Sequence, residues 1–133
     1  GDGAIISWKL REGLTDNHFL KAFYAFRRAI HRRRRHYRRK YGHEPQFKAG
    51  VHAGVVMMLQ VGQIRRDISY NGDTINTAAR IESKCSELKQ ELLISADLYN
   101  MLNSKKRFSF KNAGQIKLEG KRRSVGIYQV KKK

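Results

Sequence analysis

Large apolar side chains recur at helical spacing in the first third of the chain. They follow Asp16 and Asn17, either of which could cap a helix, at intervals of three, four or seven residues. The side chains in this stripe are Phe19, Phe23, Phe26, Ile30, Tyr37 and Tyr41. This spacing predicts one long helix with a single apolar face, which Gly42 and Pro45 bring to an end.

Shorter apolar runs predict strands, because four to eight apolar or alternating residues between turn signals are typical of β-structure. The predicted strands cover residues 4–10, 47–54, 55–61, 92–95, 108–115 and 124–130, with a polar hairpin tip at 62–65. Two shorter helices are predicted over residues 74–86 and 96–103. Strands and helices alternate without repeats or linkers, so we expect one α/β or α+β domain over residues 1–130. Residues 131–133 are expected to be a frayed basic tail.

The chain is strongly basic, with 29 Lys and Arg against 11 Asp and Glu and a net charge of +18 over 133 residues. Polyanions are therefore plausible partners. The single cysteine, Cys85, excludes a disulfide within the chain and fits a reducing compartment. No apolar run approaches the roughly 20 residues of a membrane span, which predicts a cytoplasmic domain. Because the chain opens at Gly1-Asp2-Gly3 and enters an apolar run, we expect residues upstream, and a larger membrane-anchored or multidomain protein fits as well.

Most of the positive charge lies on the predicted long helix. Its cations away from the apolar stripe are Arg27, Arg28, Arg32 to Arg35, Arg38, Arg39 and Lys40. A solvated helix face is the favoured interpretation of such a run. The alternative is an electrostatic site for nucleic acid or an anionic membrane.

Asn76 and Arg80 are four residues apart in the predicted helix after Gly72, which places both on one helix face. An amide and a guanidinium pointing the same way can donate hydrogen bonds to an oxygen-rich group that gains negative charge. Phosphoryl-transfer transition states need such stabilisation. Polar pairs at this spacing are also common on ordinary exposed helices, so the spacing alone leaves both interpretations open.

Several motifs occur in a fixed order around this pair. They are Gly1-Asp2, residues 47–54, Val61-Gly62, residues 65–67, 72–76, 78–82 and 118–121, and Tyr128-Gln129-Val130. In this order they closely resemble the catalytic domain of class III adenylate and guanylate cyclases, and bacterial members most of all. The resemblance covers almost the whole chain. It implies an α+β fold with a ferredoxin-like βαββαβ-type mixed sheet and helices on one face, without the first elements of the domain.

The resemblance also implies roles for single residues. Asp2 matches a metal-binding aspartate for Mg²⁺ or Mn²⁺, of which two ions are expected in a complete site. Asn76 matches the residue that orients the ribose, and Arg80 the residue that stabilises charge at the α-phosphate. Ser69 occupies the position that reads the purine edge, and Lys121 matches a lysine that contacts the triphosphate. The family's other metal-binding aspartate and its purine-selecting lysine lie upstream of the Gly-Asp turn.

The function implied by the resemblance is an adenylate cyclase that binds ATP and acts as a head-to-tail homodimer. Because a serine hydroxyl can donate or accept a hydrogen bond, Ser69 favours adenine without excluding a guanylate cyclase. A cyclase-like module that is catalytically inactive and binds a protein partner or polyanion is the second alternative. His52 and Cys85 are both predicted to be structural, His52 as a hydrogen-bonded residue and Cys85 as a small core residue.

Overall fold

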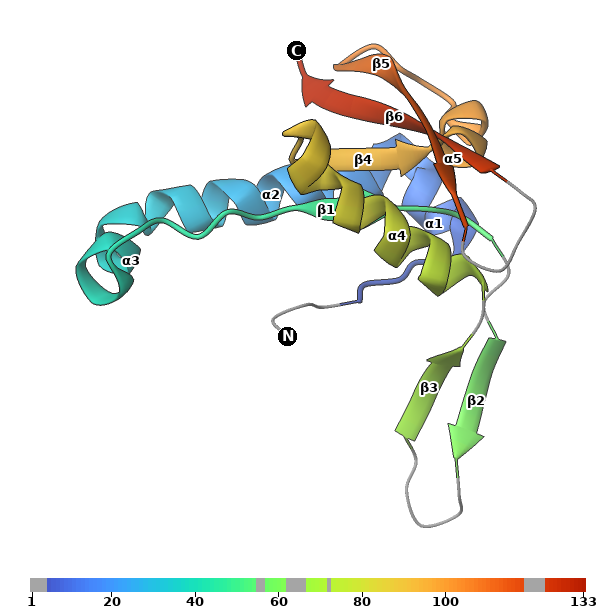
Figure 1. The fold of residues 1–133 in the computed structure, drawn as a ribbon, viewed down its shortest axis with the longest axis horizontal. Helices are drawn as coiled ribbons and strands as arrows, with labels where there is room; N and C mark the ends of the chain where they lie inside the picture. Colours follow the sequence, from blue (N-terminus) through green and yellow to red (C-terminus); the bar gives the residue numbers. More distant parts are fainter. Residues whose placement is uncertain (1–4, 55–56, 62–66, 72, 119–123) are drawn as a thin grey trace. The chain divides into compact units, whose positions relative to one another are not determined.

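A computed structural model describes residues 5–54, 57–61, 67–71, 73–118 and 124–133. The chain divides into two compact units, which are treated separately (Figure 1). The helical unit comprises residues 1–47 and 101–104, and the sheet unit comprises residues 48–100 and 105–133. Within the described residues, no helix is both long enough and apolar enough to cross a membrane.

The helical unit contains α1 (Leu10–Leu14), the 3₁₀ turn η1 (Thr15–Asn17), α2 (His18–Arg32) and α3 (Arg34–Tyr41). The predicted long helix is confirmed, with one break at Arg33. Asn17 precedes α2 with a positive φ of 55°, and its side-chain Nδ2 donates to the Ser104 carbonyl instead of capping the helix. Gly42 ends α3 as predicted, at a φ of +81° that glycine adopts without strain.

The apolar stripe of α2 packs at its N-terminal part. Phe19 and Phe23 are buried, and the Phe47 ring stacks on the Phe23 ring with 5.2 Å between centroids. Phe47 also contacts Phe26, which stays 46% exposed. Farther along, α3 has no buried residue, and its side chains are exposed except for the half-buried Arg34 and Tyr37.

The sheet unit is built on a four-stranded sheet in the order β1-β4-β6-β5. Its strands are β1 (Ala49–Val51), β4 (Leu92–Ser95), β5 (Phe108–Lys117) and β6 (Ser124–Lys132). β1 runs parallel to β4, and the other two pairings are antiparallel. Two further strands, β2 (Met57–Val61) and β3 (Asp67–Asn71), form an antiparallel hairpin, and the helices are α4 (Asp73–Leu88) and α5 (Ala96–Met101). The predicted α+β class with a mixed sheet is therefore confirmed.

Helix α4 covers one face of the sheet, where Ile81 and Cys85 join Leu93 and Ile127 in the core. The short helix α5 contacts the other face, because its Tyr99 stacks at 4.0 Å on Tyr128, which alternates with Ile127 along β6. The expected arrangement with helices on one face thus holds for α4 but not for α5. All four residues of β4 are buried, so both faces of this strand are covered by other parts of the chain.

The structure contains two elements that were not predicted from the sequence, the helix α1 and the strand β3. Two predicted elements also differ from the structure. Residues 5–9 form no strand, and the apolar side chains in this run are largely exposed, with Ile5 at 64%. No strand of the described sheets pairs with this run, and a strand without a hydrogen-bonded neighbour is not stable. At the other end, Lys131 and Lys132 belong to β6 and pair with Ser109 and Phe108, so the basic tail is not frayed.

Candidate active site

Helix α4 positions Asn76 and Arg80. Thr77, Ile81 and Cys85 recur every four residues and are buried, which fixes the side of the helix that faces the sheet. Asn76 and Arg80 each precede a member of this buried set by one residue, and both are exposed. The prediction that the two residues lie one turn apart in a helix is confirmed.

The helix lies unusually close to β1 because two glycines face it. A Cβ on Gly50 would lie 2.6 Å from the Ala78 carbonyl oxygen and would also collide with the backbone of Glu82. A Cβ on Gly54 would lie 2.5 Å from the Thr74 hydroxyl oxygen. The motif that runs from Gly50 to Gly54 therefore sets the distance between α4 and the strand beside it.

Arg80 reaches from α4 to the end of β5. Its Nη2 donates a hydrogen bond to the Lys117 carbonyl oxygen at 3.0 Å. A guanidinium carries five N–H donors, so this bond orients the group and uses one of them. The side chain is exposed, and the remaining donors can face an anion at the surface. In the sequence, Lys117 lies four residues before Lys121.

Two polar contacts in the sheet unit have partners that the sequence did not predict, and both join distant parts of the chain. The Lys48 Nζ donates to the Ser86 hydroxyl at 2.8 Å, and the His52 Nδ1 lies 2.8 Å from the Ser95 hydroxyl oxygen. That same oxygen accepts from the Leu98 N–H at 3.1 Å. Because Ser95 is fully buried and holds the first turn of α5, His52 acts as a hydrogen-bonded structural residue, as predicted.

The predicted core position of Cys85 is also confirmed, since its side chain is fully buried. Burial, with a smaller effect from the Glu82 carboxylate, raises the pKa of the thiol from 9.0 to about 11. The Sγ atom lies 3.5 Å from the Ala49 carbonyl oxygen, which accepts the S–H. The thiol therefore stays protonated at neutral pH.

The other predicted site residues cannot be placed in this geometry. Asp2 and Lys121 lie outside the described residues, as does the side chain of Ser69, whose backbone pairs with Leu59 in the hairpin. Among the described residues, no group of three or more His, Cys, Asp and Glu could hold a metal ion. The Mg²⁺ or Mn²⁺ site at Asp2 stays a prediction.

The family profile of the adenylate and guanylate cyclase catalytic domain matches residues 13–132. The chain belongs to this family. Proteins of the family generally use divalent metal ions. The match includes α4 with Asn76 and Arg80, so these residues lie within the shared part of the domain.

Two relatives illustrate the similarity in sequence. Adenylate cyclase 2 of Rhizobium meliloti (strain 1021) is 28% identical over 130 residues, which cover 98% of this chain and 36% of the relative. The photoactivated adenylate cyclase subunit beta of Euglena gracilis is 34% identical over 82 residues, covering 62% of this chain and 10% of that protein. The match thus spans 36% of the length of the Rhizobium relative and 10% of that of the Euglena relative.

Solved structures support the fold. A bacterial light-regulated adenylyl cyclase superposes with a TM-score of 0.51 at 26% identity, covering 61% of this chain and 23% of that chain. Adenylate cyclases from Trypanosoma brucei, solved in their monomeric state, superpose with a TM-score of 0.50 at 20% identity. That match covers 80% of this chain and 51% of the other. The fold is thus shared with cyclase catalytic domains.

Proposed function

We propose that the chain is the catalytic domain of an adenylate cyclase, which converts ATP to 3′,5′-cyclic AMP and pyrophosphate. The observation that carries this proposal is the exposed pair Asn76 and Arg80, one turn apart on α4, in a chain of the cyclase family. The relatives named above are adenylate cyclases, which favours ATP over GTP.

In the proposed reaction, the ribose 3′-oxygen attacks the α-phosphorus in line. A new bond forms between this oxygen and phosphorus as the hydroxyl proton is lost, and the bond to the β-phosphate's bridging oxygen breaks to release pyrophosphate. Arg80 would donate to the α-phosphate oxygens as their charge grows, and Asn76 would orient the ribose. Divalent metal ions would neutralise the phosphates when bound.

The site is proposed to form between two copies of the chain in a head-to-tail homodimer. Asn76, Arg80 and the base-reading Ser69 would come from one copy, and Asp2 with its metal from the other. The exposure of Asn76 and Arg80 supports this proposal, because a transition-state clamp needs a second surface to exclude water from it.

The activity is tested by incubating the full-length protein with ATP and Mn²⁺ and separating the products by chromatography. Cyclic AMP is the expected product, in excess of cyclic GMP from a parallel reaction with GTP. Dominant formation of cyclic GMP would identify a guanylate cyclase instead. The absence of either product from a verified dimer would overturn the proposal.

The roles of Asn76 and Arg80 are tested by replacing each with alanine. We expect kcat to fall by about 100-fold or more, because each donor acts on charge that develops in the transition state. Nucleotide affinity, measured by calorimetry, should change only a few-fold. Glu87→Gln, an exposed position in the last turn of the same helix, is the control and should leave kcat unchanged. Equal losses in kcat and affinity would contradict a transition-state role.

A second candidate function is a cyclase-like module without catalysis that binds a polyanion. The net charge of +18 favours this candidate, since ten of the 29 Lys and Arg lie between His18 and Tyr41, far in sequence from Asn76 and Arg80. The two functions differ in one measurement: a module of this kind would bind nucleotide or polyanion but form no cyclic product.

A further inference from the structure

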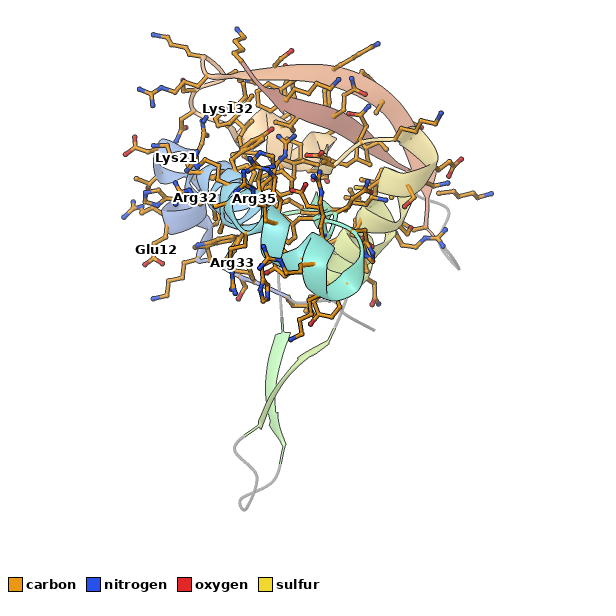
Figure 2. All side chains as sticks on the ribbon, turned by 90° about the vertical axis from the view of Figure 1, so that its left-hand side faces the viewer. Glu12, Lys21, Arg32, Arg33, Arg35 and Lys132 are labelled. Atoms are coloured by element: carbon orange, nitrogen blue, oxygen red, sulfur yellow. The ribbon has the colours of Figure 1, made fainter. Side chains whose placement is uncertain are left out.

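Helices α2 and α3 carry a row of arginines with helical spacing. Arg28, Arg32, Arg35 and Arg39, called here the arginine row, follow at intervals of four, three and four residues, and all four are exposed. These intervals place them within one helix face, apart from the local break at Arg33. At 1.5 Å per residue the row extends over about 16 Å. Arg32, Arg33 and Arg35 surround the junction of the two helices (Figure 2).

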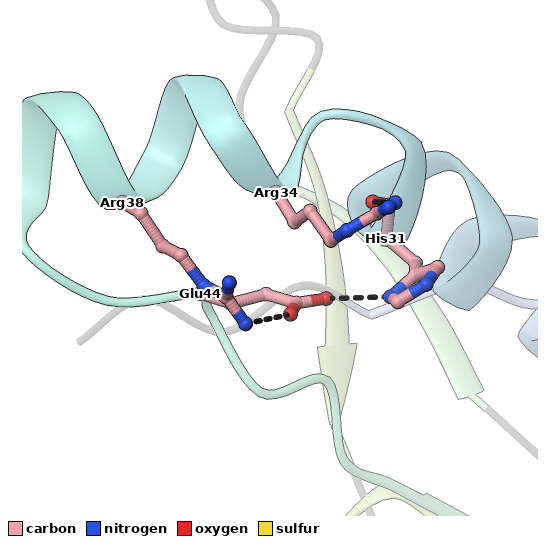
Figure 3. A network of polar contacts seen from close by, with 4 residues as sticks. All are labelled: His31, Arg34, Arg38 and Glu44. Carbon is pink, nitrogen blue, oxygen red and sulfur yellow. Dashed lines mark hydrogen bonds and ion pairs between the residues drawn. The ribbon is translucent and has the colours of Figure 1, made fainter.

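Acidic residues are missing from these helices. Between His18 and Tyr41 the sequence contains no Asp or Glu, while its cations are Lys21, Arg27, Arg28, Arg32 to Arg35, Arg38, Arg39 and Lys40. Glu44 follows α3 and pairs with His31 at 3.2 Å and with Arg38 at 3.8 Å (Figure 3). Among the described residues, no ion pair reaches the arginine row.

Repulsion between the arginines of the row therefore destabilises α2 and α3. Arg28 with Arg32 and Arg35 with Arg39 are like-charge pairs at a spacing of four, each of which destabilises a helix by about 0.2–0.5 kcal/mol. The neighbouring cations add to this repulsion. A linear polyanion along the row would remove it, whereas a single small anion would neutralise only part of it.

The apolar stripe of the same helices is engaged elsewhere. Phe47 covers Phe23 and part of Phe26, and the Lys40 Nζ lies 5.4 Å from the centroid of the Tyr41 ring. A helix that lies in a membrane surface needs a free apolar face that can enter the lipid. On α2 the buried side chains Phe19 and Phe23 are already packed, and the only apolar side chains of α3 are Tyr37 and Tyr41, whose rings stack on each other. A surface with so little free aliphatic area fits a polar ligand that contacts the arginines better than it fits lipid.

We propose that the arginine row binds the phosphate backbone of double-stranded nucleic acid without regard to base sequence. The forked guanidinium of arginine can bind two phosphate oxygens at once. Of the ten Lys and Arg between His18 and Tyr41, nine lie after Phe26, and eight of these nine are arginines that add to the positive potential around the row. A helix of about 10–12 Å diameter fits the major groove, and Arg35 and Arg39 are exposed on α3, where they can approach it. This activity does not depend on the proposed cyclase reaction.

Binding is tested by fluorescence anisotropy of the chain with a labelled mixed-sequence DNA duplex of about 20 base pairs. Four phosphate contacts predict a slope of about −3.6 for log K against log salt. Affinity should therefore fall by about 150-fold between 50 and 200 mM salt. A second duplex of unrelated sequence should bind equally well. Binding that does not respond to salt would overturn the proposal.

The assignment to the row is tested with two variants of equal charge. Arg28→Gln, Arg32→Gln, Arg35→Gln and Arg39→Gln together should lower affinity for the duplex by at least 30-fold at low salt, roughly the loss of several phosphate contacts. The matched control, Arg107→Gln, Lys111→Gln, Lys131→Gln and Lys132→Gln, removes four exposed cations from the sheet unit and should change affinity by less than about 3-fold. Equal losses would show that net charge alone attracts the duplex and would overturn the proposal.

Folding and membrane binding need separate controls. Circular dichroism should show helix content unchanged in the quadruple variant, because glutamine is a good helix former. If that variant does not fold, the pairs Arg28→Gln/Arg32→Gln and Arg35→Gln/Arg39→Gln are measured singly, and each should account for about half of the salt slope. Vesicles of phosphatidylserine and phosphatidylcholine serve as competitors. Displacement of the duplex by such vesicles at equal phosphate concentration would assign the row to a lipid surface and contradict the proposal.

Discussion

Gly50 allows the backbone of α4 to approach β1, and this close approach makes a testable prediction. In Gly50→Ala the new methyl group would meet the Ala78 carbonyl oxygen and the Glu82 backbone, neither of which can move without moving the helix. We expect the free energy of unfolding to fall by about 2–3 kcal/mol, as measured by urea denaturation. Gly126→Ala is the control, because its methyl would lie 3.1 Å from the Ala96 methyl and 4.0 Å from the Gly114 carbonyl oxygen, without an overlap as close as that at Gly50. A larger loss in the control would contradict this explanation.

Cys85 predicts how stability changes at alkaline pH. Burial raises the pKa of its thiol to about 11 in the folded state, against 9.0 without burial. Below pH 9 the thiol is protonated in both states, so its contribution is complete. As pH rises from 9 to 11 the unfolded thiol ionises first, and the free energy of unfolding should decline by about 2–3 kcal/mol. Urea denaturation of Cys85→Ala over the same range should lack this component, and identical curves for both proteins would refute it.

At the scale of elements, the final strand depends on its last residues. Lys131 and Lys132 continue the β6 ladder beside β5, and the Lys133 N–H donates to the Arg107 carbonyl oxygen. Removing residues 131–133 should therefore lower Tm by about 3–8 °C, equivalent to one or two kcal/mol. Lys131→Gln/Lys132→Gln keeps the backbone bonds and should leave Tm nearly unchanged, as monitored by circular dichroism. A loss in both variants would assign the effect to charge.

Most elements could be predicted from local patterns, and the errors have a common physical cause. The core strand β4 and the helices α2 and α4 carry strong apolar periodicity, which is read within a few residues of sequence. Residues 5–9 have the same apolar character as a strand but no partner in the described sheets. Lys131 and Lys132 look like a solvated tail, yet they pair with β5. Strand formation depends on a neighbour that a local pattern does not contain.

The candidate site likewise combines features that a local sequence pattern predicts with contacts between distant residues that it does not. The helical spacing of Asn76 and Arg80 could be predicted because it is local. The hydrogen bond from Arg80 to the Lys117 carbonyl and the contact of His52 with Ser95 each join residues about 40 positions apart, which no periodicity reveals. The glycines at positions 50 and 54 did carry a signal as part of the family motif, but their physical reasons are contacts with α4, the helix backbone for Gly50 and the Thr74 side chain for Gly54.

At the scale of the whole molecule, each proposed site would combine residues from two copies of the chain. Asn76 and Arg80 are exposed on α4, while the predicted metal ligand Asp2 belongs to a different motif. In a head-to-tail dimer each site would take the clamp from one copy and the metal from the other. Such a dimer contains two equivalent sites, so damage to the two halves can be separated by mixing variants.

Asp2→Ala and Arg80→Ala should each be inactive alone and active as a mixture. Random pairing makes about half of the dimers mixed, and each mixed dimer has one site with both changes and one with neither. The expected activity is therefore about a quarter of that of the unaltered full-length protein, measured as cyclic AMP formed after the subunits exchange. Asn76→Ala mixed with Arg80→Ala is the matched control. Both residues belong to the same half of the site, so every site in this mixture contains one of the two substitutions and should stay inactive. Recovery in the control, or none in the first mixture, would mean that Asp2 and Arg80 do not act across the dimer.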